Sequence, residues 1–274
     1  MGHPEVRRAQ MELGNLVLDG KYSAGDDPTG RALNLEWARI ITQELLGQEE
    51  YKIAVDYNIG RQDLPTNQKM WLRYCKRAAA YNVDLAQSFY AQAIMQNEAP
   101  NHTGYDDVAW VRLGSDKQYG LRTMLQSMES GMTAEQHKAA DAAYEDLVQA
   151  RRVDGAYYSF DDPLRMVTAD ELAKMPQDDP DEQLRYAFAL EAAARTDEKA
   201  YRRAMDLYRT VRDRREMDIR FVLGRNYLSG TDGMPKDLAL ARRWLQEAAS
   251  RGSNPAAEIL RVSGKDAGSA PAFQ

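Results

Sequence analysis

The segment "YLSGTDGMPKD", Tyr227 to Asp237, and the sequence "LALARRWLQEAASRG" that follows it decide the fold. A stretch rich in Gly and Pro before a helix could cradle a phosphate or form a turn between two packed helices. A phosphate loop has Gly-Lys-Ser/Thr after a strand. Here the lysine follows Pro235, no Gly-Lys-Ser/Thr occurs, and no strand pattern comes before it. The segment therefore predicts the turn of a helical hairpin.

The residue types around this turn define a repeat unit. A helix with apolar residues at helical spacing is predicted before Gly230, which supplies the backbone freedom to end it. Asp237 has the position and chemistry of an N-cap for a second helix, and Gly252 ends that helix. Asn254 and Pro255 then predict the N-cap and first residue of a third helix. One unit is a helix, a Gly/Pro turn, a helix and a Gly stop.

Small and large residues share the face where the two helices of the unit would meet. Along the second helix, Ala241, Trp244 and Leu245 fall on one side, and charged residues fall on the other. The small residues at the expected contact are Gly224, Ala248, Ala249 and Ala256. They allow the backbones to approach closely, and Trp244 fills the space beside them. This pattern indicates hairpin packing.

The unit recurs 170 residues earlier in the chain, without a gap. The equivalent positions are Leu223 and Ile53, Gly224 and Ala54, Tyr227 and Tyr57, Gly230 and Gly60, Pro235 and Pro65, Asp237 and Asn67, Trp244 and Tyr74, Ala248-Ala249 and Ala78-Ala79, Gly252 and Asn82, and Ala256 and Ala86. A weaker copy with a longer turn lies at Leu13, Gly14, Val17 and Gly20. These copies predict a protein built from internal repeats.

The rest of the chain is predicted to be helical, with one exception. We expect divergent repeats over residues 1–150, an irregular acidic and aromatic insertion or junction over 151–181, further repeats over 182–263, and a disordered tail over 264–274. Within these limits, Asn34, Ala38, Ile41 and Leu45 continue a helical pattern. Helices are expected at Asp181–Ala194, Glu198–Arg212 and Asp218–Leu228, and Thr133–Gln136 form a capping box. Alternating patterns of strand type are almost absent.

The repeat resembles the Sel-1-like repeat, a relative of the tetratricopeptide repeat. The matching positions are Leu223, Gly224, Tyr227, Gly230, Gly233, Asp237, Ala241, Trp244, Ala248, Ala249, Gly252, Ala256 and Leu260. The earlier copy departs from the pattern at Ala54, Asp63, Trp71 and Asn82. The resemblance implies an all-α fold, a right-handed α-solenoid with a concave groove, in a protein that serves as an adaptor or binding scaffold. Many bacterial members are exported to the periplasm, and a subset resembles immunity proteins that block toxic effectors of type VI secretion, including lipases.

Composition excludes several classes of protein. The chain has 274 residues and a net charge of −6, and its basic residues are scattered among acidic ones, so it has no basic stripe for nucleic acid. One cysteine, Cys75, and three histidines, His3, His102 and His137, leave little material for a disulfide framework or a zinc site. No apolar run approaches the roughly 20 residues that span a bilayer. We expect no cofactor and no metal.

The N-terminus leaves the compartment open. Its first ten residues, "MGHPEVRRAQ", lack the apolar core of a signal peptide. Met1-Gly2-His3 could be a native start or the remnant of a replaced export signal. The expected location is the periplasm, with the cytoplasm as the alternative.

No motif predicts an enzyme. Gly-x-Ser-x-Gly is absent, and Cys75 occupies the position of Leu245 in its repeat, which favours packing over nucleophilic catalysis. His102 is expected in a loop and His137 on a helix, each exposed or locally bonded. The paired carboxylates lie in predicted loops and caps, at Asp26-Asp27, Asp106-Asp107, Asp161-Asp162 and Asp178-Asp179.

The candidate partner-binding residues are Tyr157, Tyr158, Phe160, Asp161 and Asp162, in the insertion. The aromatic side chains could seal the junction between the two repeat arrays. They could also anchor a protein partner, since Tyr with acidic neighbours suits an interface.

The function that we expect is non-enzymatic protein binding, and the specific hypothesis is an immunity protein that binds and occludes a secreted toxic enzyme of the lipase or phospholipase class. The alternative is a scaffold of a bacterial envelope assembly, such as exopolysaccharide secretion.

Overall fold

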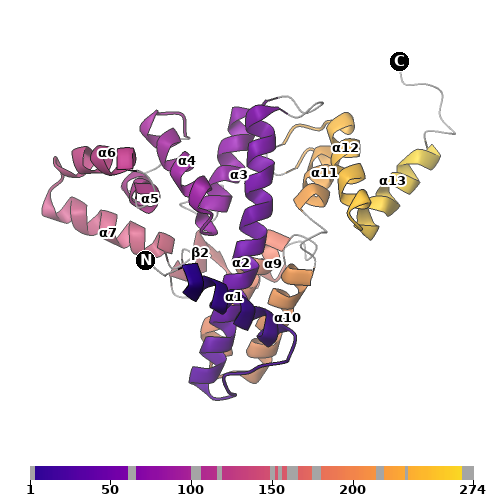
Figure 1. The fold of residues 1–274 in the computed structure, drawn as a ribbon. Coiled ribbons are helices and arrows are strands. Elements are labelled where there is room, and N and C mark those ends of the chain that lie inside the picture. The colour runs from indigo at the N-terminus through magenta and orange to yellow at the C-terminus, as the bar shows by residue number, and fades with distance from the viewer. Residues whose placement is uncertain are drawn as a thin grey trace.

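The fold is all-α, a solenoid of helix-turn-helix units, in the computed structural model shown in Figure 1. The structure describes residues 4–60, 66–99, 106–115, 119–148, 152–153, 156–158, 166–174, 180–213, 219–231 and 234–266. Its longest described helix is α2 (Pro28–Ile59), which runs through the middle of the molecule with three groups of helices around it.

Helix α2 is longer than the sequence pattern predicted. Asp27 caps its start by accepting a 2.8 Å hydrogen bond from the Gly30 amide, as its place before Pro28 suggests. The helical pattern through Leu45 and the repeat copy that begins at Ile53 are separate features of the sequence, and the structure joins them in one helix without a break. Gly47 at the junction lies within the helix, where a β-carbon would be 2.8 Å from Tyr81 Cβ. This glycine therefore serves close packing and does not end the helix.

One group of helices continues from α2 in chain order. It consists of α3 (Gln68–Ala80), α4 (Asp84–Met95), α5 (Asp106–Ser115), α6 (Tyr119–Glu129) and α7 (Ala134–Val148). Each of α3, α4 and α5 packs against the helix before it. The predicted capping box is confirmed at α7, where Thr133 N donates to Gln136 Oε1 over 2.7 Å and Gln136 N donates to Thr133 Oγ1 over 3.3 Å.

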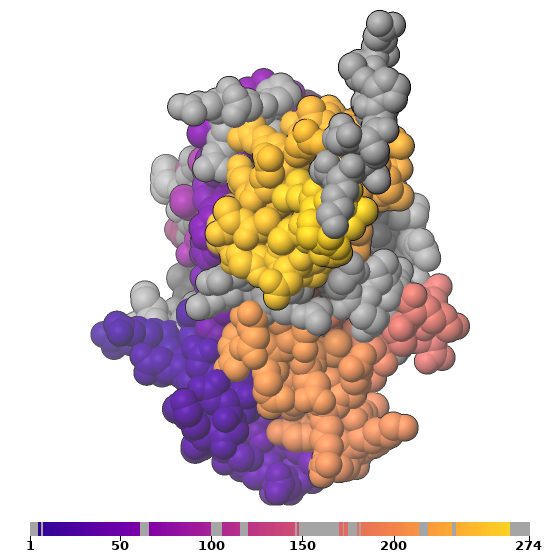
Figure 2. All heavy atoms as spheres, turned by 90° about the vertical axis from the view of Figure 1, so that its right-hand side faces the viewer, coloured from indigo at the N-terminus to yellow at the C-terminus, as the bar shows by residue number. Residues whose placement is uncertain are grey.

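A second group covers the N-terminal half of α2. Here α1 (Pro4–Leu18) and the hairpin of α9 (Pro180–Ala194) and α10 (Glu198–Asp213) contact α2, so segments far apart in the sequence lie side by side (Figure 2). Asn34 is fully buried, and its Nδ2 donates to the Tyr201 hydroxyl over 3.0 Å. Arg31 forms an ion pair with Glu198 in the same contact. The predicted helices at Asp181–Ala194 and Glu198–Arg212 are thus confirmed to within a residue.

The third group consists of α11 (Ile219–Ser229), α12 (Leu238–Ser250) and α13 (Asn254–Asp266). It lies on the opposite side of α2 from α4 to α7 (Figure 1). The helix predicted at Asp218–Leu228 is α11. Helix α13 continues to Asp266, past the boundary at 263 expected for the repeats, and residues 267–274 lie outside the described part of the chain.

Backbone hydrogen bonds confirm that the two strong sequence copies have the same local structure. The amides of Asn67 and Asp237 each donate to the carbonyl of the equivalent tyrosine, Tyr57 or Tyr227, over 2.9 Å. Gly60 and Gly230 have φ values of 68° and 72°, a left-handed conformation that glycine adopts without strain. Asn82 and Gly252 end the second helices with φ values of 65° and 97°. Asn82, which replaces the glycine of the repeat pattern, therefore keeps the same backbone geometry, since Asn tolerates the left-handed conformation.

The insertion contains a small sheet, which differs from the expectation of irregular structure. Strands β1 (Arg152–Val153), β2 (Ala156–Tyr158) and β3 (Met166–Thr168) pair antiparallel in that order, and α8 (Ala169–Leu172) follows. The strands are too short to show an alternating pattern in the sequence, and their Val and Tyr residues favour extended backbone. The sheet contacts α7 through β1 and α9 through β2, so it joins the two repeat arrays.

Candidate functional site

Two of the predicted partner-binding residues, Tyr157 and Tyr158, lie in β2. Tyr157 pairs with Arg152 and Val167, and Tyr158 pairs with Met166. Phe160, Asp161 and Asp162 lie outside the described residues. The structure therefore places the backbone of the two tyrosines in the junction sheet. Their role in binding stays a prediction.

The predicted repeat residues meet at the contact between the two sequence copies. The hydroxyls of Tyr57 and Tyr227, which occupy the same position in their copies, form a buried 2.9 Å hydrogen bond. The ring of Tyr57 also lies 6.2 Å from that of Tyr74 and 6.2 Å from that of Trp244, again an equivalent pair. We call this group of four rings the aromatic joint. The two copies thus face each other through the same surface, as the halves of a symmetric dimer do.

The other repeat residues hold this arrangement together. Gly224 lies against α12, where a β-carbon would be 2.6 Å from Leu245 Cγ. Asp237 caps α12 by accepting hydrogen bonds from the amides of Ala239 and Leu240 over 2.9 and 3.0 Å. Ala241 and Ala248 are buried, and Ala249 is half-buried. Gly233 lies outside the described residues. Gly224 and the alanines therefore serve packing, and Asp237 serves as a helix cap.

A charged network makes a second connection between α2 and the third group of helices. Arg220 is 5% exposed and donates to Glu49 Oε2 over 3.0 Å and to Glu247 Oε2 over 3.3 Å. Burial alone would raise the pKa of Glu49, but hydrogen bonds from Lys52 and Arg220 outweigh it and lower that pKa. The network links α2 to α11 and α12 electrostatically.

Three of the residues considered for catalysis, Cys75, His137 and Asp107, lie in the described part of the chain. Cys75 is buried, and burial raises the pKa of its thiol to about 12, so the reactive thiolate is suppressed. His137 is half-buried on α7, and His102 lies outside the described residues. Burial and the neighbouring Asp106 raise the pKa of Asp107, with Lys76 opposing the change. Within the described ranges, no group of three or more His, Cys, Asp or Glu could hold a metal ion.

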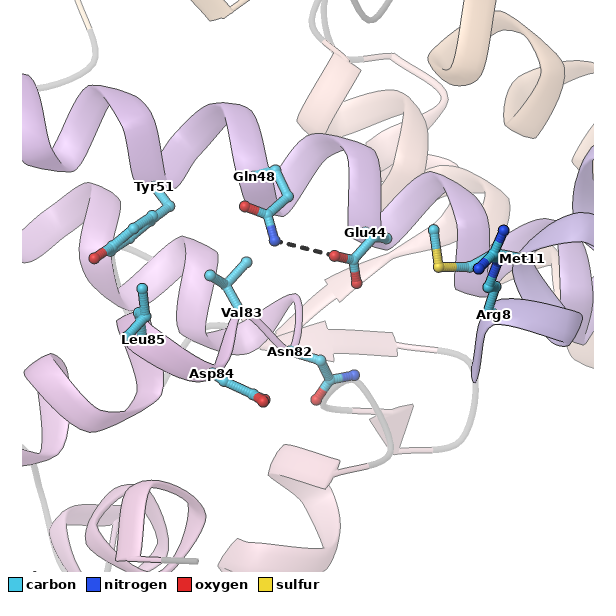
Figure 3. Close-up of a pocket in the computed structure, with 9 residues that line it drawn as sticks. All are labelled: Arg8, Met11, Glu44, Gln48, Tyr51, Asn82, Val83, Asp84 and Leu85. Carbon is cyan, nitrogen blue, oxygen red and sulfur yellow. Dashed lines mark hydrogen bonds between the residues drawn. The ribbon is translucent and has the colours of Figure 1, made fainter. Parts of the chain in front are cut away.

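An open groove lies between α2 and the α3–α4 turn, with a volume of about 320 Å³. Figure 3 shows the α2 side chains along one wall and the turn residues along the facing wall, with α1 at one end. The lining residues are Glu44, Gln48 and Tyr51 from α2, Asn82, Val83, Asp84 and Leu85 from the turn and α4, and Arg8 and Met11 from α1. The groove combines apolar and charged side chains.

The exposed face of α4 extends this surface. Leu85 is 58% exposed and Phe89, one helical turn later, is 43% exposed. The opposite face of α4 buries Ala86, Tyr90 and Ile94. Sequence reasoning missed this surface. The spacing of Leu85 and Phe89 is a signal that could have found it, since it places a second apolar stripe away from the core.

A second cavity, of about 490 Å³, lies between α10 and the loop that joins α1 to α2. Its cations are engaged with nearby carboxylates: Lys21 with Asp19, Arg202 with Glu198, and Arg209 with Asp206. Buried Asn34 supports the loop by accepting a 2.8 Å hydrogen bond from the Ala24 amide. Asn34 thus supports the loop, and the charged side chains that line the cavity pair with carboxylates close to them in the sequence.

Among the residues that the structure describes, no helix is both long enough and apolar enough to cross a membrane.

A scan of the sequence against models of known families finds no match, and a search of curated proteins finds none. Among solved structures, the chain is similar to a protective antigen of uropathogenic Escherichia coli strains that displays an SLR fold, at 17% sequence identity and a TM-score of 0.24. The similarity covers 93% of this chain and 63% of that one, so this chain spans less than two thirds of that structure. The repeat assignment of this chain rests on the motif at Leu223–Leu260 and on its backbone geometry.

Proposed function

We propose that this chain is a non-enzymatic protein-binding module, an immunity protein that inhibits a toxic enzyme delivered by type VI secretion. The partner would be of the lipase or phospholipase class, and the meeting place would be the periplasm. The repeat resemblance motivates the choice of partner.

The observation that carries the binding function is the exposed apolar surface of α4 beside the groove. A Leu and a Phe side chain, both substantially exposed one turn apart, border a concave site with polar groups. Exposed apolar surface with polar neighbours is typical of protein-binding sites. Cys75 does not compete with it as a catalytic site, because its thiol is buried and its raised pKa keeps it protonated at neutral pH.

Inhibition would be steric. The aromatic joint and the Arg220 network connect α11 to α2, and α2 in turn contacts α3, which packs on α4. A helical scaffold braced in this way presents its binding surface with little ordering cost on association. Covering the mouth of an active site would then block the substrate without any chemistry by this chain.

The test is co-purification of this chain with enzymes encoded near its gene, followed by assay of the captured enzyme. The proposal expects one enzyme in one-to-one complex that survives a high-salt wash and loses its activity. Capture of several envelope-assembly proteins without inhibition would instead support the scaffold. Measured turnover by this chain alone would refute the non-enzymatic assignment.

The double variant Tyr157→Ala/Tyr158→Ala tests the insertion as the binding site. Lost binding with an unchanged melting temperature supports the hypothesis. A collapsed melting temperature shows instead that the two side chains seal the junction between the arrays.

A further inference from the structure

We propose that the cavity between α10 and the loop that joins α1 to α2 binds a neutral saccharide unit. This inference goes beyond the proposed function, since it concerns a different surface and a small ligand. Four features of the lining carry it: a buried apolar part, an exposed aromatic ring that is held in place, a hydroxyl with a proton to donate, and charged groups that are already paired.

One face of α10 and a buried amide fix the walls of the cavity. The lining residues Tyr201, Met205 and Arg209 follow one another at about one helical turn, so they lie along one side of α10. Asn34 of α2 is fully buried, and its Nδ2 donates to Ser23 Oγ over 3.1 Å and to the Tyr201 hydroxyl over 3.0 Å. The amide therefore ties the loop to α10 and sets the distance between the two walls.

Part of the lining is apolar. Val17 and Met205 line the cavity and are buried. Tyr22 of the loop is 45% exposed, but its ring centroid lies 5.8 Å from that of Trp37, and its amide donates to the Leu16 carbonyl over 3.2 Å. These contacts hold the tyrosine while nearly half of its surface stays open to solvent. The C–H face of a sugar ring is apolar, and covering Tyr22 with it removes apolar area of both from water.

Tyr201 offers a hydrogen-bond donor to the cavity. Its ring is held beneath Arg31, whose guanidinium carbon lies 5.3 Å from the ring centroid. The hydroxyl accepts the hydrogen bond from Asn34, and no described residue accepts its proton. Because a phenol hydroxyl can both donate and accept, Tyr201 can donate to an oxygen of a ligand without losing its bond to Asn34.

The charged side chains of the lining are paired, which favours a neutral ligand over an ion. The pairs are Lys21 Nζ with Asp19 Oδ2 at 3.0 Å, Arg202 Nε with Glu198 Oε1 at 2.7 Å, and Arg209 Nη1 with Asp206 Oδ1 at 2.8 Å. An ionic ligand of either sign would have to displace one member of a pair. A hydroxyl group can instead accept from the cation and donate to the carboxylate of the same pair, since each of these groups can form several hydrogen bonds.

The size of the cavity suits a mono- or disaccharide. Its volume of about 490 Å³ lies within the range of about 300–1,000 Å³ found for small-molecule sites. A ligand with a hydroxyl on most of its carbons and a C–H face matches both the polar and the apolar parts of the lining.

The experiment is saturation-transfer-difference NMR with the full chain, which detects weakly bound small molecules. The neutral probes are glucose, galactose, mannose and N,N′-diacetylchitobiose. Two charged probes are matched to them: glucuronate to glucose, and the deacetylated, cationic form of chitobiose to the diacetyl form. We expect saturation transfer to at least one neutral probe, strongest at the C–H protons of one ring face, and weaker transfer to its charged counterpart.

Variants locate the binding within the cavity. Tyr22→Ala removes the exposed ring and should weaken the affinity for the best neutral probe about tenfold. Tyr201→Phe removes the hydroxyl but keeps the ring beneath Arg31, and should weaken the affinity about fivefold. Phe89→Ala is the matched control for Tyr22→Ala, because it removes a ring that is 43% exposed on α4 and outside the lining, and it should leave the affinity unchanged.

Three outcomes would overturn the proposal: no saturation transfer to any neutral probe, stronger transfer to the charged probes, or equal affinity of the wild-type chain, Y22A and Y201F. Melting curves check that each variant keeps its fold, and Y201F, which changes one hydroxyl, remains decisive if Y22A does not fold.

The result is separable from the proposed function. Saccharide binding without any inhibited enzyme partner would support the cavity and count against the immunity function. An inhibited enzyme partner with no saccharide binding would do the reverse. An enzyme that binds the α4 surface should be weakened by F89A and not by Y22A.

Discussion

Replacing Gly224 by alanine tests how closely α11 and α12 approach. A β-carbon at this position would lie 2.6 Å from Leu245 Cγ, 2.9 Å from Cδ2 and 3.0 Å from the Leu245 backbone nitrogen. The contact with the backbone cannot be relieved by rotating a side chain, and Leu245 is itself buried. Helices α11 and α12 must therefore move apart.

Overpacking of this kind costs about 1–3 kcal/mol, and the gain in helix propensity from Gly to Ala returns about 1 kcal/mol. We expect G224A to lower the free energy of unfolding by up to about 2 kcal/mol, or Tm by up to about 8 °C for a chain of this size. Urea unfolding followed by circular dichroism measures the change.

Gly120→Ala is the matched control. Gly120 is exposed on α6, and a β-carbon there would meet nothing within 4 Å. The same substitution should therefore stabilise by about 0.5 kcal/mol, through propensity and reduced freedom of the unfolded chain. If G224A were stabilised as much as G120A, the close approach of the two helices would be wrong.

Three further predictions concern buried ionisable groups. Tyr57→Phe removes the hydrogen bond to Tyr227 and should cost about 1 kcal/mol of stability at pH 7. Burial raises the pKa of Tyr57 above its ordinary 10.0, so the stability of the wild-type chain should fall as pH rises past about 10, where only the unfolded chain releases the proton. Urea titrations across that pH range should show a weaker pH dependence for Y57F. Glu49→Gln should destabilise the chain at pH 7 and flatten the dependence of its free energy of unfolding on acid pH. The lowered pKa of Glu49 contributes stability above its ordinary pKa of 4.5, and this stability is lost as pH falls through the lower pKa of the folded chain. An unchanged dependence on acid pH would contradict the Arg220 network. Cys75 should resist a thiol-specific chromogenic reagent at pH 8 and react fully in denaturant, whereas rapid labelling of the native chain would disprove its burial.

The geometry within each repeat could be predicted from the sequence because local chemistry determines it. A glycine that leaves the first helix, an Asp or Asn that caps the second, and small residues at the helix contact act over short separations. The alignment of Tyr57 with Tyr227 located the equivalent turns, and both turns have the same hydrogen bond to the tyrosine carbonyl. The sequence also placed Cys75 in the core through its equivalence with Leu245.

The contact between the two copies could not be predicted in the same way. Alignment shows that Tyr57 and Tyr227 are equivalent, but equivalence does not require that their hydroxyls meet. The meeting depends on how the chain returns after the insertion, which packs α9 and α10 against α2. Similarly, Gly47 gives no sequence signal of being a packing residue, because its contacts, Tyr81 and Val83, belong to the following hairpin.

The groove was missed for a related reason. Its walls come from α1, α2 and the α3–α4 turn, and no single segment contains enough of them to form a motif. The aromatic and acidic run at Tyr157–Asp162 is contiguous and therefore more conspicuous. Adjacency in the sequence is a poor guide to a surface that is assembled from several helices.

Helix α2 has a consequence for how the protein unfolds. Its 32 residues, at about 1.5 Å per residue, span about 48 Å and touch the helices before, after and far beyond it in the chain. In an ordinary repeat array each unit contacts only its neighbours, and ends can fray while the middle stays folded. Here the hydrogen-bonded backbone of α2 is continuous, and helices of both the N-terminal and the C-terminal array contact it. Unfolding of either array therefore removes contacts that hold α2, on which the other array also packs. The molecule should therefore lose its structure in one cooperative transition, with the amides in the middle of α2 among the slowest to exchange with solvent.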